Sequence, residues 1–219
     1  MDIRRSILLH IFISFTQNTQ ILLEITMEEK KTKVLVEKER NVTTYADMWH
    51  TSLILLEKGQ KEPQGSFHQI MASLVFTAFT LEAYLNHIGE KLFSCWNDLE
   101  RLSPTKKINV IAEHLNVKVD YGKRPWQVMN ELFQFRNDIA HGKSKKEKFR
   151  DIVPIEQHDP FAQPWFVQTS WEKYCTEKNA IRARKDVEQI VQVFHKTARF
   201  EDDYPFTSGF QTGSETLIV

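Results

Sequence analysis

The stretch FHQIMASLVFTAFTLEAYLNHIGEKLF, residues 67–93, decides the fold class of this chain. Apolar side chains cover most of its circumference as far as Phe79, and no helix-breaking residue interrupts it before Gly89. A helix that is apolar nearly all round has to be surrounded by other elements of the protein. We therefore expect a long central helix here, inside an all-α bundle.

An amphipathic helix is predicted on the N-terminal side of this central helix. In TTYADMWHTSLILLEKG, residues 43–59, apolar side chains recur at three- and four-residue steps, which is the period of one helix face. Thr43 or Thr44 is the expected N-cap, because a short hydroxyl side chain accepts a hydrogen bond from the first turn. Gly59 is the expected stop.

Two further helices are predicted after the central one. LSPTKKINVIAEHLN, residues 102–116, opens with Ser103 as N-cap and a proline at the first helical position. RPWQVMNELFQFRNDIAHG, residues 124–142, has Pro125 at its start and Gly142 just past its end. Both carry an inward apolar stripe, so with the two helices before them they form the core of a bundle of four to five helices.

A long irregular loop precedes the last helix of the bundle. Residues 150–170 include DIVPIEQHDPFAQPWF, which holds three prolines together with aromatic side chains. We expect this loop to pack over the bundle and assign it no further role. The last helix is expected to begin at Trp171 or Glu177 and to end at Ala198.

At 219 residues the chain is long enough for one main domain with a full core. The expected parts are an N-terminal extension with a charged lead-in, the helical bundle and a flexible C-terminal tail, over residues 1–40, 41–200 and 201–219. The opening MDIRRSILLHIFISF contains an apolar run too short to span a bilayer. We interpret residues 1–26 as an upstream extension, with Met1 or Met27 as the true start, and expect no membrane partner.

The overall composition excludes several classes of function. The formal net charge is zero, so no global field attracts nucleic acid and any such binding has to be local. Cys95 and Cys175 lie far apart without metal-ligand spacing, so we expect reduced thiols in a cytoplasmic protein. The sequence has no Gly-rich phosphate loop and no acidic metal cluster, so neither a metal nor a cofactor is expected.

The stretch FQFRNDIAHGK, residues 133–143, places an unusual set of polar side chains at the end of the fourth helix. Asn137 and His141 are four residues apart and share one helix face, and Arg136 is long enough to reach them. Histidine titrates near neutrality, so at a helix C-terminus it suits general acid or base catalysis. The cluster Arg136, Asn137 and His141 is therefore the candidate site.

An ordinary solvated helix end is the alternative interpretation of this cluster. In that case Asp138 pairs with Arg136 or Lys143, and His141 only complements the helix dipole. Helical periodicity by itself favours this alternative over a catalytic site.

The lysine run that follows the helix favours a functional site over an ordinary helix end. It contains Lys143, Lys145, Lys146, Lys148 and Arg150 against one acidic residue, Glu147, a local charge of +4 in a neutral protein. Cations of this kind beside a catalytic site contact phosphates, so we expect the four lysines to bind the phosphate groups of a ligand.

Three segments together resemble the HEPN superfamily, all-α bundles named for higher eukaryotes and prokaryotes nucleotide-binding. They are FTLEAYLNHIGEKLF on the central helix, LSPTKKINVIAEHLN on the next, and ELFQFRNDIAHGK at the end of the fourth. The resemblance covers residues 43–148. The family motif is an Arg, a polar residue directly after it and, a few positions on, a His; here these are Arg136, Asn137 and His141.

The resemblance implies a metal-independent endoribonuclease of a toxin-like defence or stress-response system. Two subunits would bring their motifs together in a homodimer, and the RNA would be cut with its own 2′-hydroxyl as nucleophile. Arg136 would clamp the phosphate, His141 would act as acid or base, and Asn137 would orient one of them. An antitoxin or regulatory protein is a further implied partner.

Several other residues bear on this interpretation. Glu82 and Asn86, four apart on the central helix, either brace the motif together with Asp138 or form an ordinary helical pair. The position two after the motif histidine, a tyrosine in HEPN toxins with nucleotidyltransferase-like antitoxins, is Lys143 here. The alternative function is a noncatalytic nucleotide- or protein-binding HEPN module. Three aromatic residues could stack bases, although packing on the bundle is the commoner role for such side chains: Trp165, Phe166 and Trp171.

Overall fold

The computed structural model describes residues 33–144, 146–148, 150, 154–155, 167–200 and 204–218. Helices make up 60% of it and the described residues hold only one two-stranded sheet, so the predicted all-α class is confirmed. The chain divides into two compact units. The helical unit comprises residues 42–209, and the second unit comprises residues 1–41 with 210–219. The apolar opening of the chain lies outside the described residues.

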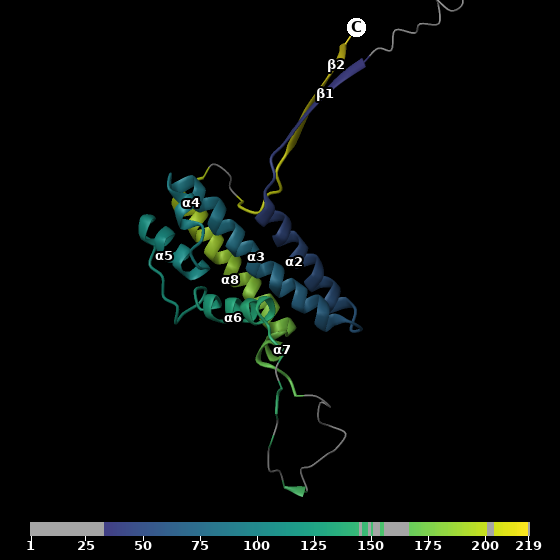
Figure 1. The fold of residues 1–219 in the computed structure, drawn as a ribbon, viewed down its shortest axis with the longest axis vertical. Coiled ribbons are helices and arrows are strands. Elements are labelled where there is room, and N and C mark those ends of the chain that lie inside the picture. Colours follow the sequence, from purple (N-terminus) through teal and green to yellow (C-terminus); the bar gives the residue numbers. More distant parts are fainter. Residues whose placement is uncertain are drawn as a thin grey trace, which may run out of the picture. The chain divides into compact units, whose positions relative to one another are not determined.

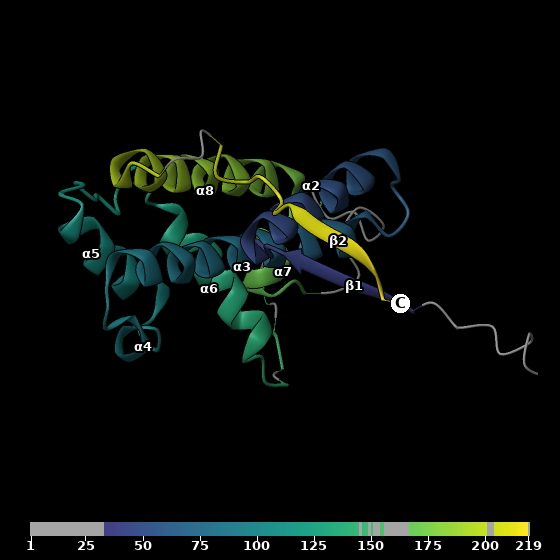
Figure 2. The ribbon, with the colours of Figure 1, turned by 90° about the horizontal axis from the view of Figure 1, so that it is seen from above.

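Seven helices form the described part of the helical unit (Figure 1). They are α2 (Thr44–Lys61), α3 (Ser66–Leu92), α4 (Trp96–Leu99), α5 (Pro104–His114), α6 (Val128–Ala140), α7 (Ser170–Tyr174) and α8 (Glu177–Ala198). Helix α3 packs against α2, α5, α6 and α8, and Figure 2 shows α8 lying across one side of α3 and α6.

The position of α3 confirms the prediction of a central helix. Leu74, Ala78, Leu81, Leu85 and Ile88 on α3 are fully buried among the side chains of its neighbours. Burying one leucine or isoleucine side chain in this way stabilises the fold by about 1.5–3 kcal/mol. The apolar circumference of α3 is therefore what holds the helical unit together.

The prediction that Gly59 stops the first helix is wrong, because α2 continues through it to Lys61. Gly59 is buried, and a Cβ added there would lie 3.2 Å from Cγ1 of Ile70 on α3. The glycine permits the close approach of α2 to α3 instead of ending the helix.

Of the predicted starts of the next two helices, the first is confirmed and the second is wrong. Ser103 is the N-cap of α5 and the proline after it opens the helix, as expected. Helix α6 begins at Val128 rather than at Pro125, which lies in a cis peptide bond with Arg124. The short helix α4 has no signal in the sequence pattern, and it covers Gly89 with the indole of Trp96.

The sequence predicts two alternative starts for the last helix, and the structure has a separately capped helix near each of them. The Thr169 hydroxyl accepts from the Glu172 N–H and the Glu172 carboxylate accepts from the Thr169 N–H, which caps α7. The Thr176 hydroxyl accepts from the N–H of Asn179 and caps α8. Two separately capped helices therefore replace one, and α8 ends at Ala198 as predicted.

Two polar clusters tie the helices together through buried charges. Arg124 forms ion pairs with Glu131 on α6 and with Asp186 on α8. Nη1 of Arg184, on α8, donates to the carbonyl oxygen of Trp49 on α2 at 2.9 Å. Such pairing is what allows a charged group to be buried without a large desolvation cost.

The second unit holds one strand in each terminal segment, where the sequence predicts a charged lead-in and a flexible tail. Strand β1 (Lys33–Arg40) pairs antiparallel with β2 (Gln211–Ile218), with Lys33 opposite Ile218 and Arg40 opposite Gln211. The sequence did not indicate this ribbon because each strand's partner lies at the other end of the chain. No helix within the described residues is both long and apolar enough to cross a membrane.

Candidate functional site

The candidate site lies at the C-terminal end of α6. His141 is the C-cap residue, and its backbone N–H donates to the carbonyl oxygen of Asn137 at 2.9 Å. A Cβ at the next residue, Gly142, would lie 2.8 Å from the carbonyl oxygen of Asp138. Because a side chain has no room there, the glycine lets the chain leave the helix directly after the histidine.

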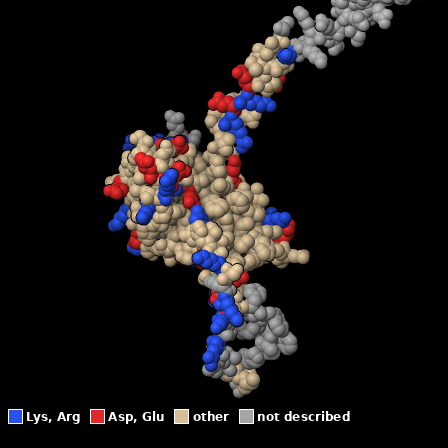
Figure 3. Space-filling view, viewed as in Figure 1, with Lys and Arg blue, Asp and Glu red and all other residues tan. Residues whose placement is uncertain are grey.

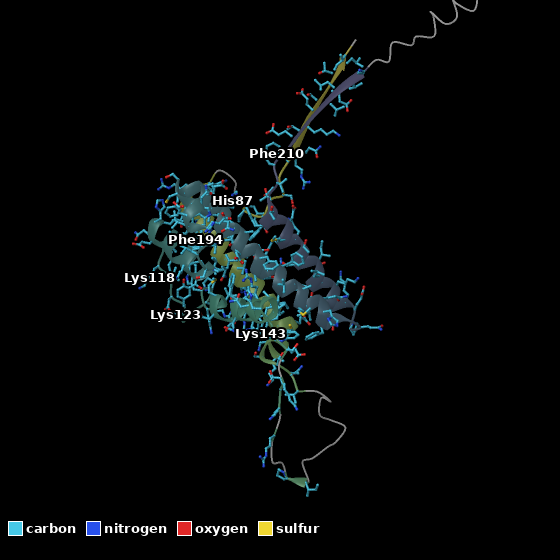
Figure 4. The ribbon with its side chains drawn as sticks, in the orientation of Figure 1. His87, Lys118, Lys123, Lys143, Phe194 and Phe210 are labelled. Carbon is cyan, nitrogen blue, oxygen red and sulfur yellow. The ribbon has the colours of Figure 1, made fainter. Side chains whose placement is uncertain are left out.

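An open concavity of about 520 Å³ adjoins this helix end. It is lined by Asn137, Asp138, His141, Gly142, Lys143 and Trp171. Lys143, labelled in Figure 4, follows the last turn of α6, and Trp171 contributes a wall from α7. Asn137, His141 and Lys143, which the sequence placed at one helix end, thus border the same space.

Arg136 is not among the residues that line the concavity. Its Nη2 donates to Oε2 of Glu82 on α3 at 2.5 Å, and its Nη1 donates to Oδ1 of Asn137 at 3.0 Å. Its guanidinium carbon lies 5.7 Å from the ring centroid of Phe79, and the side chain is 21% exposed. The positive charge of Arg136 is therefore matched by a carboxylate of its own chain, which limits its use as a phosphate clamp.

The contact between Arg136 and Asn137 fixes the orientation of the amide. The amide oxygen accepts from the guanidinium, which leaves the two N–H groups of the same amide as donors for another partner. Because Asn137 also borders the concavity, an acceptor bound there, such as a phosphate oxygen, is within the chemistry of this side chain.

Asp138 ties α6 to α7. Its Oδ1 accepts from Nε2 of Gln134 at 2.8 Å, and its Oδ2 lies 3.5 Å from the hydroxyl of Ser170. Between described residues, the ion pair of Arg136 is with Glu82 and not with Asp138. One form of the ordinary helix-end alternative, a pair between Arg136 and Asp138, is therefore absent from the described structure.

Glu82 contacts the motif directly, whereas Asn86 does so only through its neighbours. The Oδ1 of Asn86 accepts from Nζ of Lys107, on α5, at 2.6 Å. Lys107 is 2% exposed, and this burial lowers the pKa of its amine, an effect that Glu82 opposes and Arg136 adds to. A polar layer of two cations, one carboxylate and one amide thus joins α3, α5 and α6.

Sequence reasoning missed Lys107, and for Trp171 it favoured packing on the bundle over base stacking. A signal for Lys107 existed, because it lies four residues before Ile111 and next to Ile108 on the stripe predicted to be buried. A lysine at such a position has to find a partner inside the protein. Trp171 packs against Phe67 at a centroid distance of 6.2 Å, which agrees with packing on the bundle, and it also borders the concavity.

The lysine run is only partly described. Lys143, Lys146 and Lys148 are exposed, and Lys145 lies outside the described residues, as do Trp165 and Phe166. Figure 3 shows cationic and acidic side chains interspersed over the visible face of the helical unit. Among the described residues, no group of three or more His, Cys, Asp or Glu side chains is placed to hold a metal ion.

Comparison with known proteins gives no assignment. No family model matches the chain, and no curated protein and no solved structure is significantly similar to it. The case for a function therefore rests on the residues at the end of α6.

Proposed function

We propose that this protein is a metal-independent endoribonuclease of the HEPN type. The observation that carries the proposal is that His141 and Asn137 border one open concavity, while Arg136 donates a hydrogen bond to the amide oxygen of Asn137. A titratable imidazole, an oriented amide and the exposed Lys143 are groups that phosphodiester cleavage uses.

The reaction that suits these groups is transesterification within the RNA. The 2′-oxygen attacks phosphorus as the bond from phosphorus to the 5′-oxygen breaks, which leaves a 2′,3′-cyclic phosphate and a 5′-hydroxyl. One group has to remove the proton of the 2′-hydroxyl and another has to protonate the leaving oxygen. His141 is the imidazole bordering the concavity, so we propose that the second comes from His141 of another copy, in a composite site of a homodimer.

The arginine acts differently in this proposal from the clamp that the motif suggests. Because Glu82 already neutralises Arg136, the main role of Arg136 is to position the Asn137 amide. Asn137 and Lys143 then make the direct phosphate contacts. The activity would serve toxin-like defence or stress response in the cytoplasm, under an antitoxin or regulatory partner.

A noncatalytic HEPN module that binds a nucleotide or a protein is the second candidate. The observation in its favour is the engagement of Arg136 by Glu82 within the same chain. In this alternative the concavity binds its ligand, and His141 contributes a hydrogen bond without any proton transfer to a reacting group.

Incubation of the purified protein with total RNA in EDTA distinguishes the two. We expect cleavage products ending in a 2′,3′-cyclic phosphate, with a rate that falls at least about 100-fold in His141→Ala. His68→Ala, an exposed histidine on α3, is the matched control and is expected to cleave normally. Cleavage that EDTA abolishes, or that persists in His141→Ala, contradicts the proposal, and RNA binding without cleavage supports the second candidate.

A further inference from the structure

The two-stranded ribbon of β1 and β2 has no core of its own. All eight residues of each strand are exposed, and they include Val34, Val36 at 49% and Leu217 at 67%. An isolated pair of strands is at best marginally stable in water, and here no tight turn joins the strands. Additional pairing would supply the stabilisation that the ribbon lacks.

The backbone of β1 has one edge that β2 does not use. The N–H of Asn41, directly after β1, donates to the carbonyl oxygen of Phe210 at 3.1 Å, so it points towards the strand of β2. Backbone groups alternate in direction along a strand, so the N–H groups of Val34, Val36 and Lys38 point to the opposite edge, which no strand of the described residues pairs with and which we call the free edge. A row of unpaired donors and acceptors of this kind is a template for another strand.

We propose that the free edge of β1 pairs antiparallel with β1 of a second copy, with Val36 at the two-fold axis. The result is a four-stranded sheet in the order β2, β1, β1 of the partner, β2 of the partner. Val34 of each copy then lies opposite Lys38 of the other, and Lys33 lies opposite Glu39. The two outward N–H groups of Val36 donate to each other's carbonyl oxygens.

Charge complementarity selects a second copy as the occupant of this edge. On one face of β1 the cation Lys33 is at the start of the strand and the carboxylates Glu37 and Glu39 are at its end. Antiparallel self-pairing places that cation opposite an anion twice, and opposite charges across strands are stabilising. Moving the axis to Glu37 instead sets two carboxylates against each other. An axis at Leu35 would pair Lys33 with Glu37, and the exchange of Lys33 and Glu39 described below distinguishes that register from the proposed one.

The other face of the same sheet gains an apolar cluster. Val34 is directly opposite Leu217 within one copy, and Val36 meets Val36 of the partner at the axis. The edge of β2 offers no comparable self-match, because Glu215 is its one charged residue and Gly213 weakens the strand. The interface therefore belongs to β1, and it does not depend on the proposed ribonuclease activity.

Substitution of Val36 by proline tests the proposal in the full-length chain. Proline lacks the N–H at the free edge, and the pairing of β1 with β2 does not use that N–H. We expect the wild-type chain to sediment as a dimer at micromolar concentration and Val36→Pro to weaken dimerisation at least about 100-fold. Hydrogen exchange at the Val34 and Val36 amides is expected to slow with rising protein concentration.

Charge reversal tests the register and keeps the test independent of any folding defect caused by proline. Lys33→Glu and Glu39→Lys are each expected to weaken the dimer about tenfold, because each places like charges opposite one another twice. The double variant, with both reversals, is expected to regain wild-type affinity. A failure of this rescue overturns the proposed register.

Two other outcomes overturn the proposed interface. One is a wild-type monomer whose Val34 and Val36 amides are protected at every concentration, which would mean that the chain's own residues cover the edge. The other is a dimer that Val36→Pro leaves intact, in which case the copies meet elsewhere. Ribonuclease activity can persist in the second case, because a composite site can form through another interface. A wild-type monomer would also remove the second His141 that the composite site needs, so cleavage of RNA by the wild type and by His141→Ala tests the proposed function separately.

Discussion

At the scale of single residues, the ion pair between Arg136 and Glu82 determines what the motif can do. The Oε2 of Glu82 is 2.5 Å from the guanidinium, and both side chains are about three-quarters buried. A partly buried pair is costly to break, because the remaining charge is left without a partner. The pair therefore fixes Arg136, and through it Asn137, before any ligand arrives.

Glu82→Gln is expected to destabilise the fold by about 1–3 kcal/mol, because it leaves the partly buried charge of Arg136 uncompensated. Urea unfolding followed by circular dichroism measures this free energy. Glu57→Gln is the matched control: Glu57 forms an exposed pair with Lys61 at 4.0 Å, and its loss should cost less than about 1 kcal/mol. Equal effects of the two variants would mean that the Arg136 pair contributes no more than a surface contact.

Cys175 provides a prediction about pH. Burial, with a smaller contribution from Glu172, raises the pKa of its thiol from 9.0 to about 12. Between these values the folded state keeps a proton that the unfolded state has lost, so stability falls as pH rises. Within that window the free energy of unfolding falls by about 1.4 kcal/mol per pH unit. Below pH 9 the stabilising contribution of the buried, protonated thiol is fully present.

Unfolding in urea at pH 8, 9 and 10 tests this sign. Cys175→Ala is expected to lose stability with pH less steeply than the wild type, whatever its stability at pH 8. Cys95→Ala, at an exposed cysteine, is expected to keep the wild-type slope. A slope unchanged by Cys175→Ala would show that the thiol does not titrate abnormally in the folded state.

At the scale of elements, the contact of α3 with α4 depends on a residue without a side chain. A Cβ added at Gly89 would lie 2.3 Å from carbons of the Trp96 indole, which is far inside van der Waals contact. The indole packs against the α3 backbone and is 4% exposed. The glycine therefore provides the space that seats α4, rather than marking a helix end.

Gly89→Ala is expected to destabilise the protein by about 1–3 kcal/mol, because the ring has to move in a packed core. Helix propensity by itself predicts the opposite, a gain of about 1 kcal/mol, so the sign of the change is decisive. Urea unfolding of Gly89→Ala, Trp96→Phe and the double variant forms a mutant cycle. The smaller ring is expected to relieve part of the cost, and strict additivity would mean that the two residues do not conflict.

At the scale of the whole molecule, the net charge is zero, so any electrostatic attraction of RNA depends on local clusters of charge. Lys and Arg side chains lie among acidic ones over the face of the helical unit that Figure 3 shows, whereas the lysines after α6 are concentrated next to the concavity. Salt screens exposed charges beyond about 8 Å, so only lysines close to bound RNA affect its affinity. The lysine run is thus testable against lysines elsewhere on the same protein.

Replacing Lys143, Lys145, Lys146 and Lys148 by Gln is expected to weaken RNA binding and to flatten its salt dependence. Each lost phosphate contact lowers the log–log slope by roughly 0.7 for a single strand. The matched control replaces four exposed lysines elsewhere, Lys58, Lys61, Lys118 and Lys123, the last two labelled in Figure 4. Filter binding at several salt concentrations compares the two variants, which carry the same net charge, and identical losses would remove the run from the site.

The sequence by itself determined the elements that depend on neighbouring residues. The apolar circumference of α3, the start of α5 after Ser103 and the glycine after His141 all depend on residues within a few turns of helix, so periodicity and helix-start rules suffice to predict them. The same local information placed Asn137 and His141 on one face.

Only the tertiary structure decided which partners these elements have. Glu82 meets Arg136 from 54 positions away in the chain, Lys107 turns inward to Asn86, and Trp171 closes one wall of the concavity. The strands β1 and β2 pair across almost the whole chain, where no local pattern links them. Long-range contacts depend on how helix faces and strand edges match in space, and a local pattern in one sequence does not contain that information.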